Sequence, residues 1–145
     1  MKSNFKISIL FFFSVIFFSC NYNSINKANQ QGIEISNIKQ IETLKKEMID
    51  YMEFAEPSYT LKDVEFCESI LTDFITNIDK SSTIEEGTEI IKSTIFQLNE
   101  LNKKCDFDLI ETNERERIAE IIIKAGHKKG YNSLNEDVTE KWREW

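Results

Sequence analysis

Two of the three cysteines and the only histidine are the residues best suited to nucleophilic or metal chemistry. A thiolate beside an imidazole makes a strong nucleophile, but the spacing of Cys67, Cys105 and His127 gives no reason to place the histidine next to a thiol. Structural zinc needs four ligands, typically with paired cysteines, and the sequence has no CxxC. We therefore predict no catalytic residue, no metal site and no cofactor. Cys67 is expected to be a small buried side chain and His127 a surface residue at a helix end.

Cys67 and Cys105 are not expected to form a disulfide. Helices that run antiparallel about a turn near Ser81 place Cys67 opposite residue 95. Cys105 then lies about 15 Å further along, at about 1.5 Å per residue, whereas a disulfide requires Cα atoms within about 7 Å. A bridge would require a different order of helices, and the oxidation state of the two thiols stays open.

Acidic residues are the other candidates for chemistry. Asp106, Asp108 and Glu111 have a spacing that calcium ligands can adopt, but the segment lacks the remaining ligands and the glycine turn of an EF-hand. We expect these residues to solubilise a loop and to cap the helix that follows. Carboxylate pairs suited to glycoside hydrolysis arise by chance among 25 acidic residues.

Trp142 and Trp145 are the only tryptophans, and their spacing of three places them on one face of a helical turn. Aromatic side chains contribute large burial energies and are enriched in binding hot spots. We predict that at least Trp142 packs on the domain near the fourth helix. Contact with a partner is the alternative, and both residues are candidate partner-binding residues.

The first twenty residues have the order of a secretory signal peptide. Lys2 and Lys6 precede an apolar run over residues 7–18, and Ser19 and Cys20 follow it. A positive start, an apolar run of this length and a small residue before the cleavage site are typical of export signals. The run is shorter than the roughly 20 apolar residues that cross a bilayer.

The segment Phe17-Phe18-Ser19-Cys20 resembles the lipobox of bacterial lipoproteins. In that family the cysteine thiol is joined to a diacylglycerol, a peptidase cuts just before the cysteine, and the new N-terminus is usually acylated. Phe17 stands where the family usually has leucine. The resemblance implies that residues 1–19 are a signal peptide, that Cys20 is the lipidation site, and that the protein is exported and lipid-anchored to the cell membrane or outer membrane. An ordinary signal peptide cut near Cys20 is the alternative.

The rest of the chain divides into a tether and an acidic domain. Residues 20–33 are polar after the cysteine and are expected to form a flexible tether that spans on the order of 20 Å. Without Lys2 and Lys6 the chain has 16 basic and 25 acidic residues, a net charge of −9. Anionic lipid repels such a charge, and it offers no basic surplus for nucleic acid. We expect a domain over residues 34–145 that stands off the membrane and binds no nucleic acid.

Apolar residues recur every three or four positions from residue 35 onward, which predicts an all-α domain. Four glycines and one proline are too few for the turns of an all-β chain. We predict a compact bundle of about four helices with a short C-terminal helical turn, and we expect Gly87 to mark a close helix contact. The first helix is expected to end before Pro57, and the last long helix to end at Gly130. The second, third and fourth helices are expected to start at Thr60 with Asp63, at Ser82 with Glu85, and at about Thr112.

Residues 98–145 resemble the C-terminal half of a group of small uncharacterised bacterial proteins. The resemblance implies a shared helical domain, with or without a lipid anchor, and it implies no activity. Its motifs are Leu98-Asn99-Glu100-Leu101-Asn102, Leu109-Ile110-Glu111-Thr112 with Arg115-Glu116, and Thr139-Glu140-Lys141-Trp142-Arg143-Glu144-Trp145.

Two functions remain open for an acidic helical domain on a lipid anchor. We predict that it is not an enzyme but a membrane-tethered module that binds a protein partner, and the acidic charge favours a basic one. An immunity protein against a toxin is one specific form of this prediction. The alternative is an envelope enzyme that uses carboxylates in a cleft, although the sequence names no nucleophile, base or oxyanion donor.

Overall fold

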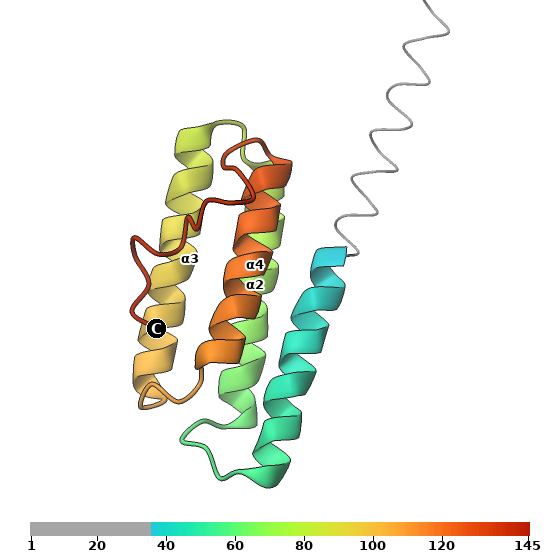
Figure 1. Cartoon of the computed structure of the whole chain (residues 1–145), viewed down its shortest axis with the longest axis vertical. Helices are drawn as coiled ribbons and strands as arrows, with labels where there is room; N and C mark the ends of the chain where they lie inside the picture. Colours follow the sequence, from blue (N-terminus) through green and yellow to red (C-terminus); the bar gives the residue numbers. More distant parts are fainter. Residues whose placement is uncertain (1–35) are drawn as a thin grey trace, which may run out of the picture. The chain divides into compact units, whose positions relative to one another are not determined.

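Four helices account for most of residues 36–145, the part of the chain that the computed structural model describes (Figure 1). The N-terminal helix covers residues 36–54 of this part. It is followed by α2 (Leu61–Lys80), α3 (Ile84–Lys104) and α4 (Thr112–Lys128). The described residues contain no strand. The predicted all-α bundle is confirmed, whereas the predicted signal peptide, Cys20 and the whole of the predicted tether lie outside the described residues.

Local hydrogen bonds fix the start of α2 where the sequence predicts it. The carboxylate of Asp63 accepts from the Thr60 backbone N–H at 2.9 Å and from its hydroxyl at 2.6 Å. Such a capping box satisfies backbone donors that have no partner within the helix. The N-terminal helix ends before Pro57, also as predicted.

The predicted start of α3 is wrong by one residue. Thr83, not Ser82, caps this helix, and its hydroxyl accepts from the Glu86 N–H at 3.2 Å. The Ser82 N–H instead donates to the Glu86 carboxylate at 2.7 Å. Ser82 and Glu85 are three positions apart, and so are Thr83 and Glu86. Both pairs have the spacing of a capping box, so the spacing alone does not show which hydroxyl caps the helix.

α4 begins at Thr112 as predicted and ends in a turn that needs glycine. Gly130 has a φ of 75°, and its N–H donates to the His127 carbonyl at 2.8 Å. The Tyr131 N–H reaches the Gly126 carbonyl at 3.0 Å. These two bonds make a Schellman motif, in which glycine adopts the left-handed conformation without strain.

The helices pack through their apolar stripes into one core. The antiparallel pair of α2 and α3 is closed at the end away from their connection by the ion pair of Asp63 and Lys104, at 2.8 Å. The N-terminal helix lies against α2 and α4, so it is held by elements later in the chain. The largest fully buried apolar side chains are Leu44, Met48, Val64, Leu71, Phe74, Ile95, Leu98, Leu109, Ile118, Ile121 and Ile122.

The C-terminal segment, residues 129–145, returns along the bundle as turns that end in a single helical turn. The Tyr131 hydroxyl is 3.0 Å from that of Ser81, and the Asn132 amide donates to the Ile123 carbonyl at 3.1 Å. The predicted close contact at Gly87 exists, but with a different partner. The ring of Tyr131, not another helix, occupies the space beside this glycine.

Candidate functional site

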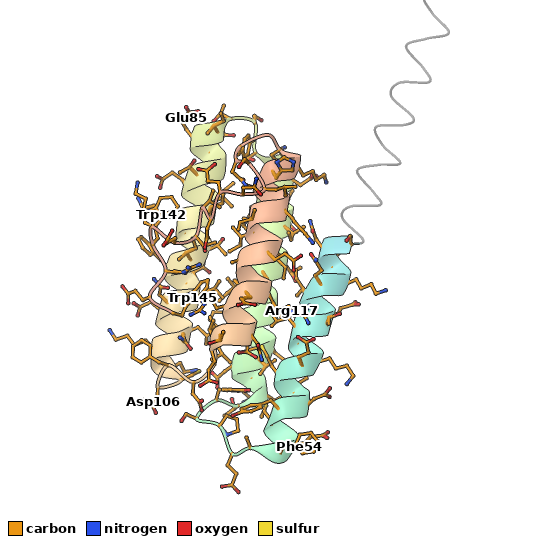
Figure 2. The ribbon with its side chains drawn as sticks, viewed as in Figure 1. Phe54, Glu85, Asp106, Arg117, Trp142 and Trp145 are labelled. Atoms are coloured by element: carbon orange, nitrogen blue, oxygen red, sulfur yellow. The ribbon has the colours of Figure 1, made fainter. Side chains whose placement is uncertain are left out.

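The two tryptophans lie half-buried against the core, which confirms that the chain end docks. Asn99 of α3 holds it, since its amide donates to the Trp142 carbonyl at 2.8 Å and accepts from the Glu144 N–H at 3.1 Å. The chain end is thus bonded to α3, and Arg143 beside Trp142 lines a hollow together with α4, near which the sequence predicted the docking. Figure 2 shows Trp142 and Trp145 on the side of the bundle away from the N-terminal helix. Their role in binding a partner stays a prediction.

Cations cover parts of both rings. The Lys141 ammonium lies 5.1 Å from the centre of the Trp142 ring, and the Arg143 guanidinium lies 5.9 Å from that of Trp145. Arg143 is held in turn by the Asp137 carboxylate at 2.6 Å. The cations at this chain end therefore pack on tryptophans and a carboxylate of the same segment.

Cys67 and Cys105 are buried free thiols. Burial raises the pKa of Cys67 to about 12 and also raises that of Cys105. A nucleophilic cysteine needs a lowered pKa and access to solvent, so this environment does not suit nucleophilic chemistry. The expected register of α2 and α3 put Asp63 opposite Asn99, whereas Asp63 pairs with Lys104. That register brings Cys105 nearer to Cys67 than the sequence argument implied.

The acidic residues of the loop after α3 have structural roles in the loop and in the cap of α4, as predicted. Asp106 takes a left-handed φ of 54°, Asp108 accepts from the Ser58 N–H at 2.6 Å, and Glu111 caps α4. His127 is exposed at the end of α4 and bonds the Asn132 carbonyl at 2.9 Å. Within residues 36–145, no three metal-binding side chains come together.

A hollow whose charged lining is mainly acidic lies between the N-terminal helix and α4. We call this feature the acidic hollow. Its volume is about 510 Å³, and it is lined by Glu47, Tyr51, Asn113, Glu114, Glu116, Arg117 and Glu120. Residues at positions 116 and 120 share one face of α4 because they are four apart.

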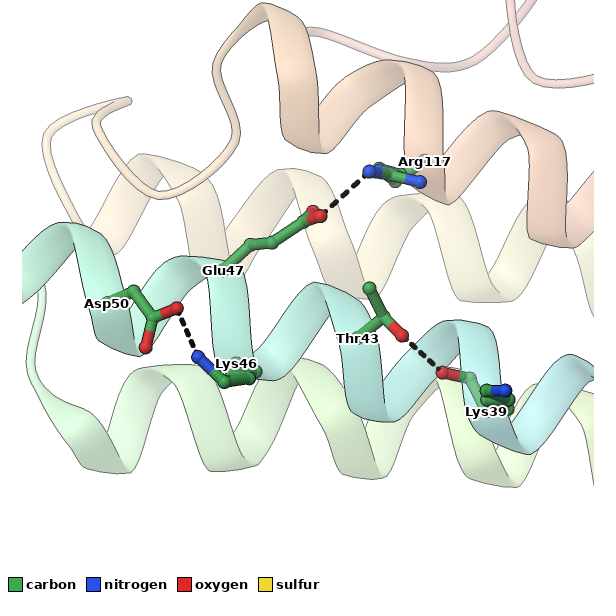
Figure 3. Close-up of polar contacts among 6 residues, drawn as sticks. All are labelled: Lys39, Thr43, Lys46, Glu47, Asp50 and Arg117. Carbon is green, nitrogen blue, oxygen red and sulfur yellow. Dashed lines mark hydrogen bonds and ion pairs between the residues drawn. The ribbon is translucent and has the colours of Figure 1, made fainter.

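One ion pair joins the two helices across the acidic hollow. Arg117 donates to the Glu47 carboxylate at 2.7 Å, as Figure 3 shows. Glu114 accepts from the Glu111 N–H at 3.2 Å and belongs to the capping box of α4. Glu116 takes part in no ion pair of the described residues. Glu120 pairs with Lys124 on its own helix. Glu114 and Glu116 are therefore the carboxylates of the acidic hollow that take part in no ion pair of the described residues, and they make the local field negative.

A smaller polar hollow of about 180 Å³ continues the acidic hollow along the same two helices. The two share Arg117 and Glu120, and Lys39 and Thr43 line the smaller one. The Thr43 hydroxyl donates to the Lys39 carbonyl at 2.8 Å (Figure 3). Together the two hollows form a polar groove beside Arg117.

The acidic hollow was not found from the sequence because its two walls are far apart in the chain. Glu47 and Arg117 are separated by 70 positions. The available signal was the run of four acidic residues over 111–120, in which Glu116 and Glu120 share a face. Nothing in that run indicates which helix lies opposite.

None of the helices in residues 36–145 is long and apolar enough to cross a membrane. Comparison of the chain with protein-family models, with curated proteins and with solved structures finds no match.

Proposed function

We propose that the protein is a lipoprotein, anchored through Cys20, whose acidic helical domain binds a basic protein partner at the cell envelope. The observation that carries the proposal is the acidic hollow, in which Glu47, Glu114, Glu116 and Glu120 surround a cavity of about 510 Å³. The lipobox-like sequence ending at Cys20 supports the anchor. An immunity protein that neutralises a basic toxin is one form that this function takes.

The chemistry of the acidic hollow suits lysine and arginine side chains. Glu116 is exposed and engaged in no ion pair of the described residues, so an incoming cation meets a carboxylate without displacing another cation. Tyr51 is 48% exposed at the edge of the cavity, and an aromatic face attracts cations within about 6 Å. The net negative charge of the domain steers a basic partner and makes its association sensitive to salt.

Binding fits these carboxylates better than the alternative of an envelope enzyme. A carboxyl group that acts as a general acid is usually buried, because desolvation keeps it protonated near neutral pH. The side chain of Glu47 is 42% exposed even while it pairs with Arg117, and that of Glu120 is 47% exposed. Carboxylates that remain in water are suited to pairing with cations.

Photo-crosslinking at the acidic hollow tests this function. Tyr51 is replaced by a photoreactive benzoylphenylalanine in the full chain, and intact cells are irradiated. We expect one crosslinked product whose second component is a basic envelope protein. Replacing Glu116 and Glu120 with glutamine removes two of the four carboxylates and should reduce the yield by about tenfold.

A matched variant separates the acidic hollow from the overall charge. Glu65→Gln with Asp73→Asn removes the same charge from the exposed face of α2 and should leave the yield unchanged. An equal loss in both variants would assign the effect to net charge. If a photoreactive residue at Lys141, beside Trp142, captures the partner and one at Tyr51 does not, the partner binds at the chain end and the hollow is not its site.

A further inference from the structure

An exposed aromatic surface lies between α2 and α3 and shares no residue with the acidic hollow. We call it the Phe96 face. It surrounds an open hollow of about 670 Å³ to which Phe66 of α2 and Phe96 of α3 contribute. Phe66 is 53% exposed and Phe96 is 46% exposed. Paired exposed aromatics of this kind are typical of interaction surfaces.

The charges on the Phe96 face follow a two-fold pattern along α3. From its start to its end the helix carries Glu89, Lys92, Phe96, Glu100 and Lys104 around the hollow. Their spacings of three and four keep them on one face of the helix. The order is acid, base, aromatic, acid, base, so Phe96 is the midpoint of a charge pattern that complements itself.

We propose that a second copy of this chain covers the Phe96 face, with the two α3 helices antiparallel about a two-fold axis at Phe96. Such an axis places Lys92 of each chain against Glu100 of the other, and Glu89 near Lys104. Phe96 then meets its own symmetry mate, and Phe66 flanks the contact on each side. A self-complementary patch of this kind is what a two-fold dimer interface requires.

The charges within one chain do not compete strongly with this pairing. Lys92 is 3.6 Å from Glu89 on its own helix, and Lys104 bonds Asp63 at 2.8 Å while its side chain stays 72% exposed. The exposed pair of Lys92 and Glu89 contributes little to stability. Lys104 keeps its bond to the buried Asp63 and has two further N–H donors for a carboxylate of the second copy. Burial of the phenylalanines would provide most of the affinity, and the charges would fix the antiparallel orientation.

The proposal does not rest on the proposed function. The dimer buries one face of α2 and α3, whereas the acidic hollow lies between the N-terminal helix and α4. Each dimer would therefore present two acidic hollows.

Cysteine crosslinking of the full chain in its membrane tests the dimer. Gln97→Cys puts a thiol one position from the proposed two-fold axis and leaves Phe96 in place, and mild oxidation should give a dimer on a non-reducing gel. The native Cys67 and Cys105 are buried and should not react. Ile84→Cys is the control, because Ile84 is exposed on the same helix but would lie about 36 Å from its symmetry mate, at about 1.5 Å per residue.

Exchange of charges gives a second measurement on the same interface. In the Gln97→Cys protein, Lys92→Glu alone or Glu100→Lys alone creates two like-charged pairs across the interface and should reduce crosslinking by about tenfold. In a mixed dimer of the two single variants, positions 92 and 100 again carry opposite charges in both pairs, so coexpression should restore crosslinking. Equal crosslinking through Ile84→Cys, or no restoration on coexpression, would overturn the proposal.

Discussion

Asn99 is a buried polar residue whose hydrogen bonds are directed at the C-terminal segment. Its two bonds to the backbone at Trp142 and Glu144 are the reason that the chain end lies on α3. A buried amide is costly unless it is bonded, so the docked segment and the asparagine depend on each other. Sequence spacing does not identify such a residue, because an asparagine on the buried side of a helix only interrupts the apolar stripe.

Substitution of Asn99 tests this mutual dependence. Asn99→Ala should lower the free energy of unfolding by about 1–3 kcal/mol, because two backbone groups lose a partner. The emission of the tryptophans should also move to longer wavelength, since Trp142 and Trp145 become more exposed. Urea unfolding followed by fluorescence measures both effects. Asn77→Ala, on the exposed side of α2, is the control, and identical behaviour of the two variants would contradict the assigned role of Asn99.

At the scale of elements, Asp63 joins the start of α2 to the end of α3. Hydrogen bonds from Lys104 and Thr60 lower the pKa of its carboxyl from 3.8 to about 2. A folded-state pKa below the unfolded one means that the charged carboxylate stabilises the fold above pH 3.8. This stabilisation is lost as the pH falls through about 2.

Comparison of the wild-type protein with Asp63→Asn measures this contribution. The wild type should be the more stable, and the difference in the free energy of unfolding should be constant near neutral pH. It should shrink between about pH 4 and pH 2, where the carboxyl takes up its proton. A difference that stays the same over this range would show that the charge of Asp63 contributes nothing.

Gly87 in the first turns of α3 makes room for the ring of Tyr131. Alanine is favoured over glycine within a helix by about 0.5–1 kcal/mol, but here its methyl group would displace that ring and weaken the contact with Ser81. We expect Gly87→Ala to destabilise the wild-type protein and to stabilise the Tyr131→Ala variant. Thermal unfolding of the four proteins measures the two effects, and an effect of the same sign in both backgrounds would contradict the contact.

Much of this element structure was predictable because its causes are local. The Thr60 and Asp63 capping box, Gly130 and the apolar stripes act within a few residues, and each gives the expected boundary. The cap of α3 was misplaced because neighbouring residues offer the same bonds. The register of α2 on α3 and the position of Tyr131 depend on contacts between distant segments, which spacing does not encode.

At the scale of the whole molecule, two separate surfaces carry the proposals. The acidic hollow needs the N-terminal helix and α4 side by side, and the ion pair of Glu47 and Arg117 joins them there. The Phe96 face needs only α2 and α3. The sequence shows the acidic charge, from which a basic partner is predicted, but it does not show which helices bring the charge together.

The compartment in which these surfaces act depends on Cys20. The thiol is the predicted attachment point, and the proposed export would bring the domain to partners of the envelope. The central claim of the proposed function is therefore that the mature protein begins at a lipidated cysteine.

The mass of the protein extracted from membranes tests that claim most directly. We expect a chain that lacks residues 1–19 and carries a diacylglyceryl group on Cys20, and Cys20→Ala should accumulate as an uncleaved and unmodified precursor. A wild-type mass equal to that of the unmodified 145-residue chain would contradict it.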